Sequence, residues 1–450
     1  MTVHAERWSA SENDGPVADF VVRGIGLLAT LAGSAPRTGS AMRELGLVED
    51  AAVASRAGRI LWAGPERDLD RAAVVPATAV VLDAEGALVT PGFVDPHTHL
   101  AFVGNRDDEI RRLLAGTSYA EIAAAGGGIA RTVAATREAP VDALARAVEQ
   151  RLDEMLACGT TTAEVKSGYG LELGAEIRSL EAIHYASTRH PMTVVPTFLG
   201  AHEVPKERRD QRERYIDAII EDMIPEVAVR GLATFGDVFC EQGVFSVAES
   251  RRILEACRAH GLGLRIHADE LAWTGGAELA AELGARSADH LVHVSDAGIA
   301  ALRESHCVAT LLPTAAFYLR LGRSAPARAL IDGGASVALA TDVNPGGGLS
   351  PSLPFAMALA SFGMGLTLEE ALTAVTVNAA ASLDLGAEVG QVAPGFRTDL
   401  VVLRSARLLD LFRVGVPAIR TVVKDGQVVV RDGRVAWHET WRKQSSEDQS

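Results

Sequence analysis

From residue 93 onward, short apolar runs alternate with longer stretches in which apolar residues recur at helical spacing. Continuous apolar strands that alternate with helices are typical of a parallel sheet with helices on its faces. Eight such units over this length predict an α/β fold, a closed (β/α)8 TIM-like barrel, while a doubly wound open sheet remains the alternative. The predicted strands are residues 93–95, 161–165, 193–198, 235–240, 263–267, 288–292, 308–312 and 336–340. The predicted helices are 140–158, 173–188, 247–260, 275–283, 296–304 and a last helical region over 368–383.

Both ends of the chain have a different pattern, with short β-type runs separated by Gly, Pro and Asp turns. The predicted strands there are 19–22, 47–53, 60–64 and 79–82, and then 399–403, 420–423 and 427–430. We expect residues 17–88 and 385–440 to form one small composite β domain beside a barrel domain of residues 89–384. Residues 1–16 are expected to be poorly ordered and residues 441–450 to form a polar tail.

Composition narrows the class of protein. The chain has 450 residues, 48% of them hydrophobic, and a formal net charge of −15, which argues against nucleic acid or an anionic membrane as a partner. No apolar run reaches the length of a membrane span, and the N-terminus lacks the pattern of a secretory signal. The four cysteines are far apart and form no Cys-x-x-Cys pair, which indicates reduced thiols and a cytoplasmic location.

The first candidate for chemistry is the segment Pro-Gly-Phe-Val-Asp-Pro-His-Thr-His at residues 91–99. In extended backbone, residues i and i+2 point to the same side, so His97 and His99 can aim two imidazoles at one point. A metal site needs this arrangement, although two histidines in a surface loop are the simpler interpretation of the pair alone.

Further metal-type side chains coincide with other barrel strands. His267 closes the fifth strand, His290 lies in the sixth, and Asp342 closes the eighth. In a barrel, the chemistry lies at the carboxyl ends of the strands. Three histidines and one carboxylate are a normal ligand set for Zn²⁺ or Fe²⁺ with a position left for water.

These segments and several others carry a resemblance to a known family. Together they resemble the imidazolonepropionases of the amidohydrolase superfamily, from about Leu88 to Ala380. The resemblance implies a zinc or iron ion and a reaction in which water opens the ring of 4-imidazolone-5-propanoate to N-formimidoyl-L-glutamate in histidine degradation. It also implies that His97, His99, His267 and Asp342 are the metal ligands. The segments are residues 91–99, 104–106, 126–129, 164–170, 198–203, 267–270 and 340–346.

The physical roles of three catalytic candidates follow from that assignment. Asp342 can hold the metal with one carboxylate oxygen and accept the proton of the attacking water with the other. Glu270, three residues after His267, is expected to transfer a proton to the leaving ring nitrogen, although a carboxylate also favours a helix N-terminus for its own sake. His290 is expected to orient the water or polarise the carbonyl, with a buried histidine bonded to the backbone as the alternative.

A substrate with a propionate needs a cation nearby. Arg106 is the candidate because a guanidinium binds a carboxylate with two hydrogen bonds, and a solvated loop charge is the alternative. Tyr169 and His202 are expected to complete the carboxylate site. The remaining substrate-binding candidates are Glu270, Asn344, Gly346, Gly347 (where a hydroxyl residue is expected in this family) and, more weakly, Tyr119.

Some superfamily members bridge two metals with a carboxylated lysine. Lys166 lies in the second predicted strand, and the fourth ends at Cys240-Glu241 without a lysine, so we expect one metal per chain. Glu241 is a candidate either for supporting a ligand or for a structural role. The fold suggests a homodimer. Two other functions stay open: a deaminase of the same fold, which has less need of Arg106, and a non-catalytic relative, which would usually have lost ligands.

Overall fold

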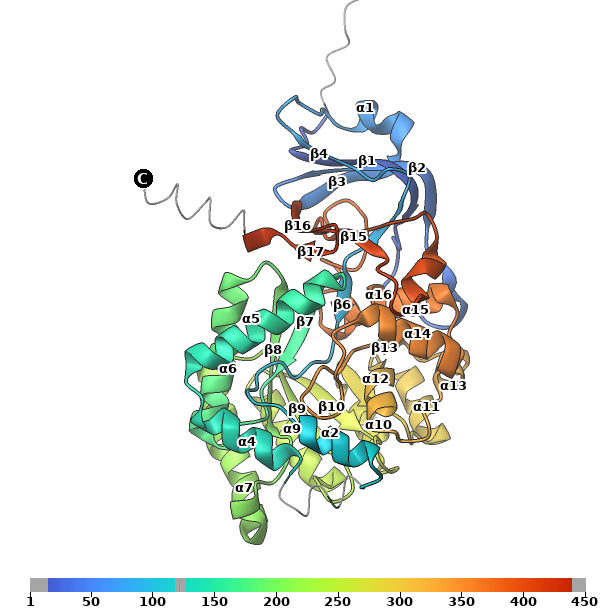
Figure 1. Ribbon diagram of the computed structural model, residues 1–450. Helices are drawn as coiled ribbons and strands as arrows, with labels where there is room; N and C mark the ends of the chain where they lie inside the picture. Colours follow the sequence, from blue (N-terminus) through green and yellow to red (C-terminus); the bar gives the residue numbers. More distant parts are fainter. Residues whose placement is uncertain (1–14, 118–120, 122–126, 439–450) are drawn as a thin grey trace, which may run out of the picture.

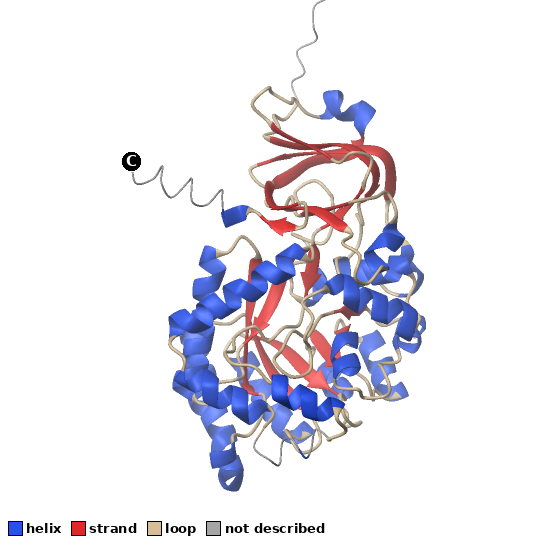
Figure 2. Ribbon diagram, viewed as in Figure 1, coloured by secondary structure: helices blue, strands red, loops and turns tan. Residues whose placement is uncertain are grey.

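The computed structural model describes residues 15–117, 121 and 127–438, which form a barrel wrapped by helices and a second sheet beside it (Figures 1 and 2). The predictions for residues 1–14, Tyr119, Gly126 and residues 441–450 lie outside the described residues.

The barrel predicted from the sequence is confirmed. Its eight strands follow one another in chain order, and every neighbouring pair is parallel, unlike the strand order of a doubly wound sheet. The observed bounds match the predicted strands to within three residues. They are β6 (Phe93–Asp95), β7 (Thr160–Lys166), β8 (Thr193–Ala201), β9 (Phe235–Cys240), β10 (Gly263–Ala268), β11 (Ser287–His290), β12 (Val308–Leu311) and β13 (Val337–Leu339).

The barrel closes just beyond the ends of its first and last strands. There the backbone N–H of His99 donates to Val343 O (2.8 Å), and that of Asp342 donates to His97 O (3.1 Å). The carboxylate of Asp95 in β6 also accepts hydrogen bonds from the backbone and the hydroxyl of Thr341. The closure therefore brings two histidines and an aspartate into register at the carboxyl end of the barrel.

Helices cover the outside of the barrel (Figure 2). Five of them match predicted helices closely: α5 (Val141–Ala157), α6 (Leu173–Arg189), α9 (Val247–Ala259), α10 (Gly276–Glu282) and α11 (Asp296–Glu304). The last helical region is two helices, α15 (Leu368–Ala374) and α16 (Val377–Ser382), because the backbone of Thr376 is not helical (φ −128°, ψ −91°). The other helices are α1 (Leu69–Ala72), α2 (Asp107–Leu114), α4 (Ile129–Glu138), α7 (Arg212–Ala218), α8 (Ile224–Val229), α12 (Pro313–Tyr318), α13 (Ala327–Asp332) and α14 (Leu353–Met364).

The second sheet combines strands from both ends of the chain, as expected. Its centre is the antiparallel pairing of β5 with β14, which joins the N-terminal and C-terminal strands. The chain passes from β5 into β6 through Gly92, where an added Cβ would lie 2.3 Å from Thr161 Oγ1. The strands are β1 (Phe20–Ala29), β2 (Leu47–Arg56), β3 (Arg59–Pro65), β4 (Val80–Asp83), β5 (Leu88–Pro91), β14 (Leu400–Leu403), β15 (Ile419–Lys424), β16 (Gln427–Arg431) and β17 (Arg434–Val435).

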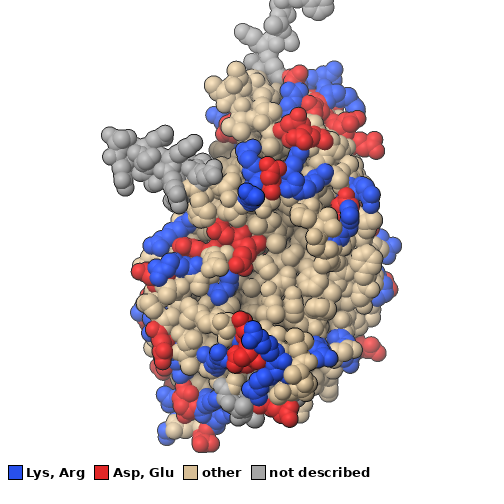
Figure 3. All heavy atoms as spheres, in the orientation of Figure 1, with Lys and Arg blue, Asp and Glu red and all other residues tan. Residues whose placement is uncertain are grey.

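Among the described residues, no helix combines the length and apolar character that crossing a membrane requires. On the face seen in Figure 3, acidic and basic side chains are interspersed around a broad uncharged area.

Candidate metal centre and pocket

Four predicted ligands converge at the carboxyl end of the barrel. Nε2 of His99 lies 3.3 Å from Nε2 of His97 and 3.4 Å from Nε2 of His267. Oδ1 of Asp342 lies 3.4 Å from Nε2 of His99 and 3.7 Å from Nε2 of His97. Ligands about 2.0–2.2 Å from one tetrahedral ion are roughly 3.3–3.6 Å apart, so these four distances are close to those of a single metal site, and His97, His99 and Asp342 form one compact group.

The chemistry of these donors also fits a cation. Nδ1 of His97 is hydrogen-bonded to Asp289 Oδ2 (2.6 Å), and Nδ1 of His267 faces Asp237 Oδ2 at 3.0 Å. A carboxylate beside Nδ1 favours the tautomer with its proton there, which leaves the Nε2 lone pair free to bind a metal. Oδ1 of Asp342 is buried without a hydrogen-bond partner. Neutral imidazoles and one carboxylate suit a divalent ion.

Burial keeps the imidazoles of His97 and His99 neutral. It lowers the pKa of His97 well below the usual value for histidine, and the charge of Lys166 lowers it further. Burial likewise lowers the pKa of His99, with His202 as the next cause. Burial raises the pKa of Asp342 to about 7, an effect that His267 opposes. A cation at this point would offset the cost of keeping this carboxylate ionised.

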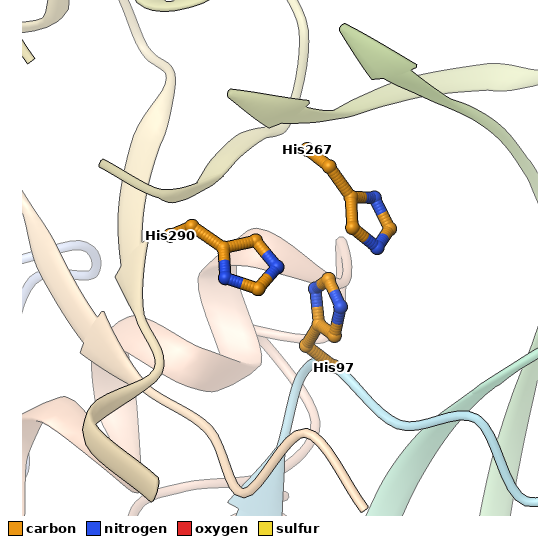
Figure 4. Close-up of side chains that lie close together, drawn as sticks. All are labelled: His97, His267 and His290. Carbon is orange, nitrogen blue, oxygen red and sulfur yellow. The ribbon is translucent and has the colours of Figure 1, made fainter. Parts of the chain in front are cut away.

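His290 lies beside the same ligands. Its ring forms a second compact group with His97 and His267, and the three rings face one another (Figure 4). Its Nδ1 is 3.5 Å from Oε1 of Glu270. Within the described part of the chain, its ring makes no hydrogen bond to the backbone. The structure therefore gives no support to the alternative considered from the sequence, a buried histidine bonded to the backbone.

Glu270 is a buried carboxyl group close to the ligands. Burial raises its pKa well above the usual value, and the negative charges of Asp342 and Glu241 add to the shift. The group is therefore a neutral acid that can give up a proton. Glu241 itself accepts hydrogen bonds from the backbone N–H of Gln242 and Leu271, both 2.8 Å, and so holds the turn that follows Glu270.

A cavity of about 240 Å³ opens onto these groups. Of the twelve predicted site residues, only His97 does not line it, and that residue is fully buried behind the others. The predicted residues that line the cavity are His99, Arg106, Tyr169, His202, His267, Glu270, His290, Asp342, Asn344, Gly346 and Gly347.

Arg106 presents a cation to this cavity. Its side chain is 5% exposed, and its Nε donates to Oγ1 of Thr132 (2.9 Å). Among the described residues, no carboxylate forms an ion pair with Arg106. The alternative considered from the sequence, a loop side chain whose charge is solvated by water, therefore does not fit this buried residue. An added Cβ at Gly346 would lie 2.4 Å from Nη1 of Arg106, which means that this glycine makes room for the guanidinium.

The two other predicted carboxylate-binding residues lie side by side. The rings of Tyr169 and His202 are 5.3 Å apart, and His202 stacks on His99. Nδ1 of His202 is 2.9 Å from the carbonyl oxygen of Gly168, to which only a protonated nitrogen can donate. Burial lowers the pKa of His202 to about 3, so its Nε2 is a hydrogen-bond acceptor. An acceptor is suited to an N–H group and not to a carboxylate.

The turn after Asp342 uses Asn344 internally. The side chain of Asn344 accepts from the backbone N–H of Gly346 (2.9 Å) and Gly347 (2.6 Å) and donates to Asp342 O (2.8 Å). An added Cβ at Gly347 would lie 3.2 Å from the side chain of Leu319. Where a hydroxyl residue was expected, this chain therefore has an apolar wall.

Sequence reasoning missed two kinds of residue. Apolar cavity residues such as Phe239, Leu319 and Leu321 carry no chemical signal that separates them from core residues. Asp237 and Asp289, which face the ligand histidines, did offer one: each is a carboxylate inside a barrel strand, and the strand of Asp237 is otherwise apolar. A buried charge in such a strand needs a partner.

Comparisons of sequence agree with this geometry. A sequence profile described as "Amidohydrolase family" matches residues 88–429. A protein of Symbiobacterium thermophilum named imidazolonepropionase is 48% identical over 419 residues, which cover 93% of this chain and 98% of that protein. A protein of Geobacillus kaustophilus with the same name is 48% identical over 412 residues, which cover 91% of this chain and 97% of that protein.

Solved structures share the fold at much lower sequence identity. An adenosine deaminase from Xanthomonas campestris with bound zinc has a TM-score of 0.70 at 16% identity, and 97% of this chain and 98% of that chain are covered. A triazine hydrolase variant has a TM-score of 0.72 at 15% identity, with 95% and 98% covered. At such identities the likeness concerns the fold alone.

Proposed function

The chain belongs to the amidohydrolase family, in the branch of the imidazolonepropionases, and we propose that it hydrolyses the cyclic amide of 4-imidazolone-5-propanoate to N-formimidoyl-L-glutamate in histidine degradation. The observation that carries the proposal is the guanidinium of Arg106, which forms no ion pair among the described residues and lies in the same cavity as a set of metal-type ligands. A hydrolase for a ring that bears a carboxylate needs both features.

The family and the donor set support a divalent metal ion. We propose one ion per chain, zinc or iron, held by His97, His99, His267 and Asp342. When bound there, such an ion would acidify water and polarise the ring carbonyl.

The protein's own groups would handle the protons. A carboxylate oxygen of Asp342 would accept the proton of the attacking water. Glu270, neutral because its pKa is raised, would donate a proton to the ring nitrogen as the C–N bond breaks. The neutral ring of His290, whose Nδ1 lies 3.5 Å from Oε1 of Glu270, would orient the water or polarise the ring carbonyl.

Substrate orientation would come from the opposite wall of the cavity. Nε of Arg106 donates to Thr132, so the propionate would be bound by the two Nη groups of the same guanidinium. Tyr169 would support the same carboxylate. His202 would accept a hydrogen bond from a ring N–H, a different role from the carboxylate contact expected from the sequence alone. Nucleobase deaminases of this fold act on rings without a carboxylate. In such an enzyme, the guanidinium of Arg106 would find no anionic group on the substrate to bind.

Three further features remain proposals. We propose that the second sheet and the barrel correspond to the domain ranges predicted above, that the protein acts in the cytoplasm, and that it is a homodimer. The dimer is suggested by the fold alone, and a stable monomer in sedimentation analysis would contradict it.

The decisive experiment measures turnover of freshly prepared 4-imidazolone-5-propanoate by the loss of its ultraviolet absorbance, with and without a chelator. We expect rapid turnover that the chelator abolishes and added metal restores. A matched imidazolone without the propionate should react with a much higher KM, because Arg106 then has nothing to bind. No turnover by metal-loaded protein would contradict the proposal.

A further inference from the structure

Five charged side chains lie fully buried inside the barrel, beneath the ligand histidines. Each is at most 1% exposed, and they come from β7 and from the three adjacent strands β9, β10 and β11. Burying a charge is costly unless it is paired, so such a cluster must be held by its internal contacts. The five are Glu164, Lys166, Asp237, Arg265 and Asp289.

One half of the cluster begins at Asp237, which lies beside His267. Oδ2 of Asp237 lies 3.0 Å from Nδ1 of His267 and 2.8 Å from Nζ of Lys166. The same ammonium group donates to Oε1 of Glu164 (2.7 Å). Lys166 is therefore occupied by two carboxylates below the ligands, which agrees with its exclusion as a metal-bridging residue.

The other half leads from Glu164 to His97. Oε1 of Glu164 is 3.8 Å from Nε of Arg265, whose Nη2 is 3.5 Å from Oδ2 of Asp289. That oxygen is the one bonded to Nδ1 of His97 at 2.6 Å. The five side chains thus form a continuous sequence of alternating charges, called here the buried charge chain, between two ligand histidines whose rings converge in Figure 4.

The carboxylates of the chain offset the cost of burying its ammonium group. Burial alone would lower the pKa of Lys166, but Asp237 and Glu164 raise it above its usual value. Three carboxylates and two cations leave one net negative charge, and Asp342 adds a second. A divalent ion would neutralise the whole assembly.

Glu164 is the member that both halves share. It contacts both cations, and its Oε2 also accepts a hydrogen bond from the backbone N–H of Thr98 (3.2 Å), the residue between His97 and His99. The hydroxyl of Thr98 donates back to Glu164 O (2.6 Å). A change at Glu164 therefore reaches three ligand histidines without touching any of them.

We propose that Glu164, Lys166 and Arg265 are positioning residues of the metal centre, which act through Asp237 and Asp289 to set its affinity for a divalent ion. The inference rests on the metal site of the proposed function but not on its substrate. Without Lys166 and Arg265, the carboxylates of Asp237 and Asp289 would be buried with no cation to balance their charge. Neither carboxylate could then hold its histidine in the metal-binding tautomer.

The test compares zinc affinity, measured by competition with a chromophoric chelator, between wild-type protein and Glu164→Gln. This substitution keeps the shape, removes one negative charge and directs an amide N–H₂ at the two cations. We expect the dissociation constant for zinc to rise by about 10- to 100-fold. The matched control is Asp399→Asn, which breaks a buried ion pair with Lys424 (3.0 Å) in the other sheet. It should lower thermal stability and leave zinc affinity unchanged.

A dissociation constant within twofold of wild type in Glu164→Gln, or an equal loss of affinity in Asp399→Asn, would overturn the inference. Wild-type protein that binds no zinc would overturn both this inference and the proposed metal site. If Glu164→Gln does not fold, the metal-free wild type still provides a test by nitrogen-15 NMR of its histidines. His97 and His267 should carry their protons on Nδ1, and protons on Nε2 would contradict the proposal.

Discussion

Three polar residues at the carboxyl ends of barrel strands have backbone conformations that favour glycine: Asp269 (φ 52°), His290 (φ 77°) and Asp342 (φ 53°). Each such backbone conformation costs about 1–3 kcal/mol and persists only where the surrounding contacts enforce it. At Asp342 the surroundings are the bonds to His97 and Asn344 that close the barrel and shape the next turn. Strain of this kind concentrates at functional sites.

Residue types, strand positions and the family resemblance were enough to predict eleven residues that line the cavity, while the ligand set itself stays a prediction. What the sequence could not supply were properties that depend on a neighbour in space. The role of His202 depends on the carbonyl of Gly168, and the availability of Arg106 depends on the lack of a nearby carboxylate. Neither contact is visible in the residues that surround these positions in the sequence.

The proton on Glu270 gives a prediction for the pH profile. If a neutral Glu270 donates the proton, kcat/KM should fall as the pH rises through its raised pKa, because the ionised form has no proton to give. Glu270→Gln should lower kcat by about 10²- to 10⁴-fold and remove that limb of the profile. Its metal content should equal that of wild type. A variant with nearly normal kcat would show that another group is the acid.

The contact between Gly346 and Arg106 gives a second prediction. Gly346→Ala should raise KM about tenfold with little change in kcat, because the new methyl group displaces the guanidinium that binds the carboxylate. Combining it with Arg106→Gln should add little to the KM of Arg106→Gln alone, since both act on one interaction. Gly363→Ala, where an added Cβ meets nothing within 4 Å, is the control and should have wild-type kinetics. Additive effects in the double variant would contradict this account.

At the scale of elements, long apolar strands and amphipathic helices were predicted well because their periodicity is local. The structure departs from the prediction where tertiary contacts decide. β5 is only four residues long and is stabilised by β1 and β14 from distant parts of the chain. The predicted helix over 368–383 is interrupted at Thr376, whose hydroxyl donates to Leu372 O (2.6 Å). A pattern of apolar residues does not reveal such a break.

The loop of residues 167–171 shows how one element can hold a binding residue. Glu176, fully buried in the first turn of α6, accepts hydrogen bonds from the backbone N–H of Gly168 (3.0 Å), Gly170 (2.7 Å) and Leu171 (2.8 Å). Its carboxylate thereby fixes the loop that carries Tyr169. The carbonyl that fixes His202 belongs to the same loop.

Glu176→Gln should therefore weaken substrate binding more than chemistry. Its amide N–H₂ would face N–H groups, and we expect KM to rise about tenfold while kcat changes much less. Metal content should stay normal. Hydrogen exchange at residues 167–171 should accelerate. Glu181→Gln, at a side chain of the same helix that is 35% exposed and pairs with Arg230, is the control and should match wild type in both measurements. A proportional fall in kcat at constant KM would indicate that the loop does not act on binding.

At the scale of the whole molecule, the metal site and the closure of the barrel are the same structure. β6 and β13 are joined near the site by two backbone hydrogen bonds and by the contact of Asp95 with Thr341, just where His97 and Asp342 leave their strands. The proposed ligands come from these two strand ends and from β10 across the barrel. An ion bound to all four ligands would therefore link segments that are up to 245 residues apart in the sequence, from His97 to Asp342.

This arrangement predicts that the metal stabilises the fold. An ion that binds only the folded state at a thousandfold excess over its dissociation constant adds about 4 kcal/mol to the free energy of unfolding. Scanning calorimetry should thus show a Tm several degrees higher with zinc than with chelator, and the shift should vanish in His99→Ala, which lacks one ligand. Equal Tm values for wild-type protein in zinc and in chelator would mean that these four side chains bind no ion in the folded protein. In that case their spacing would have to be explained by packing, although packing gives no reason for Oδ1 of Asp342, which is buried without a hydrogen-bond partner among the described residues, to face the Nε2 atoms of His97 and His99.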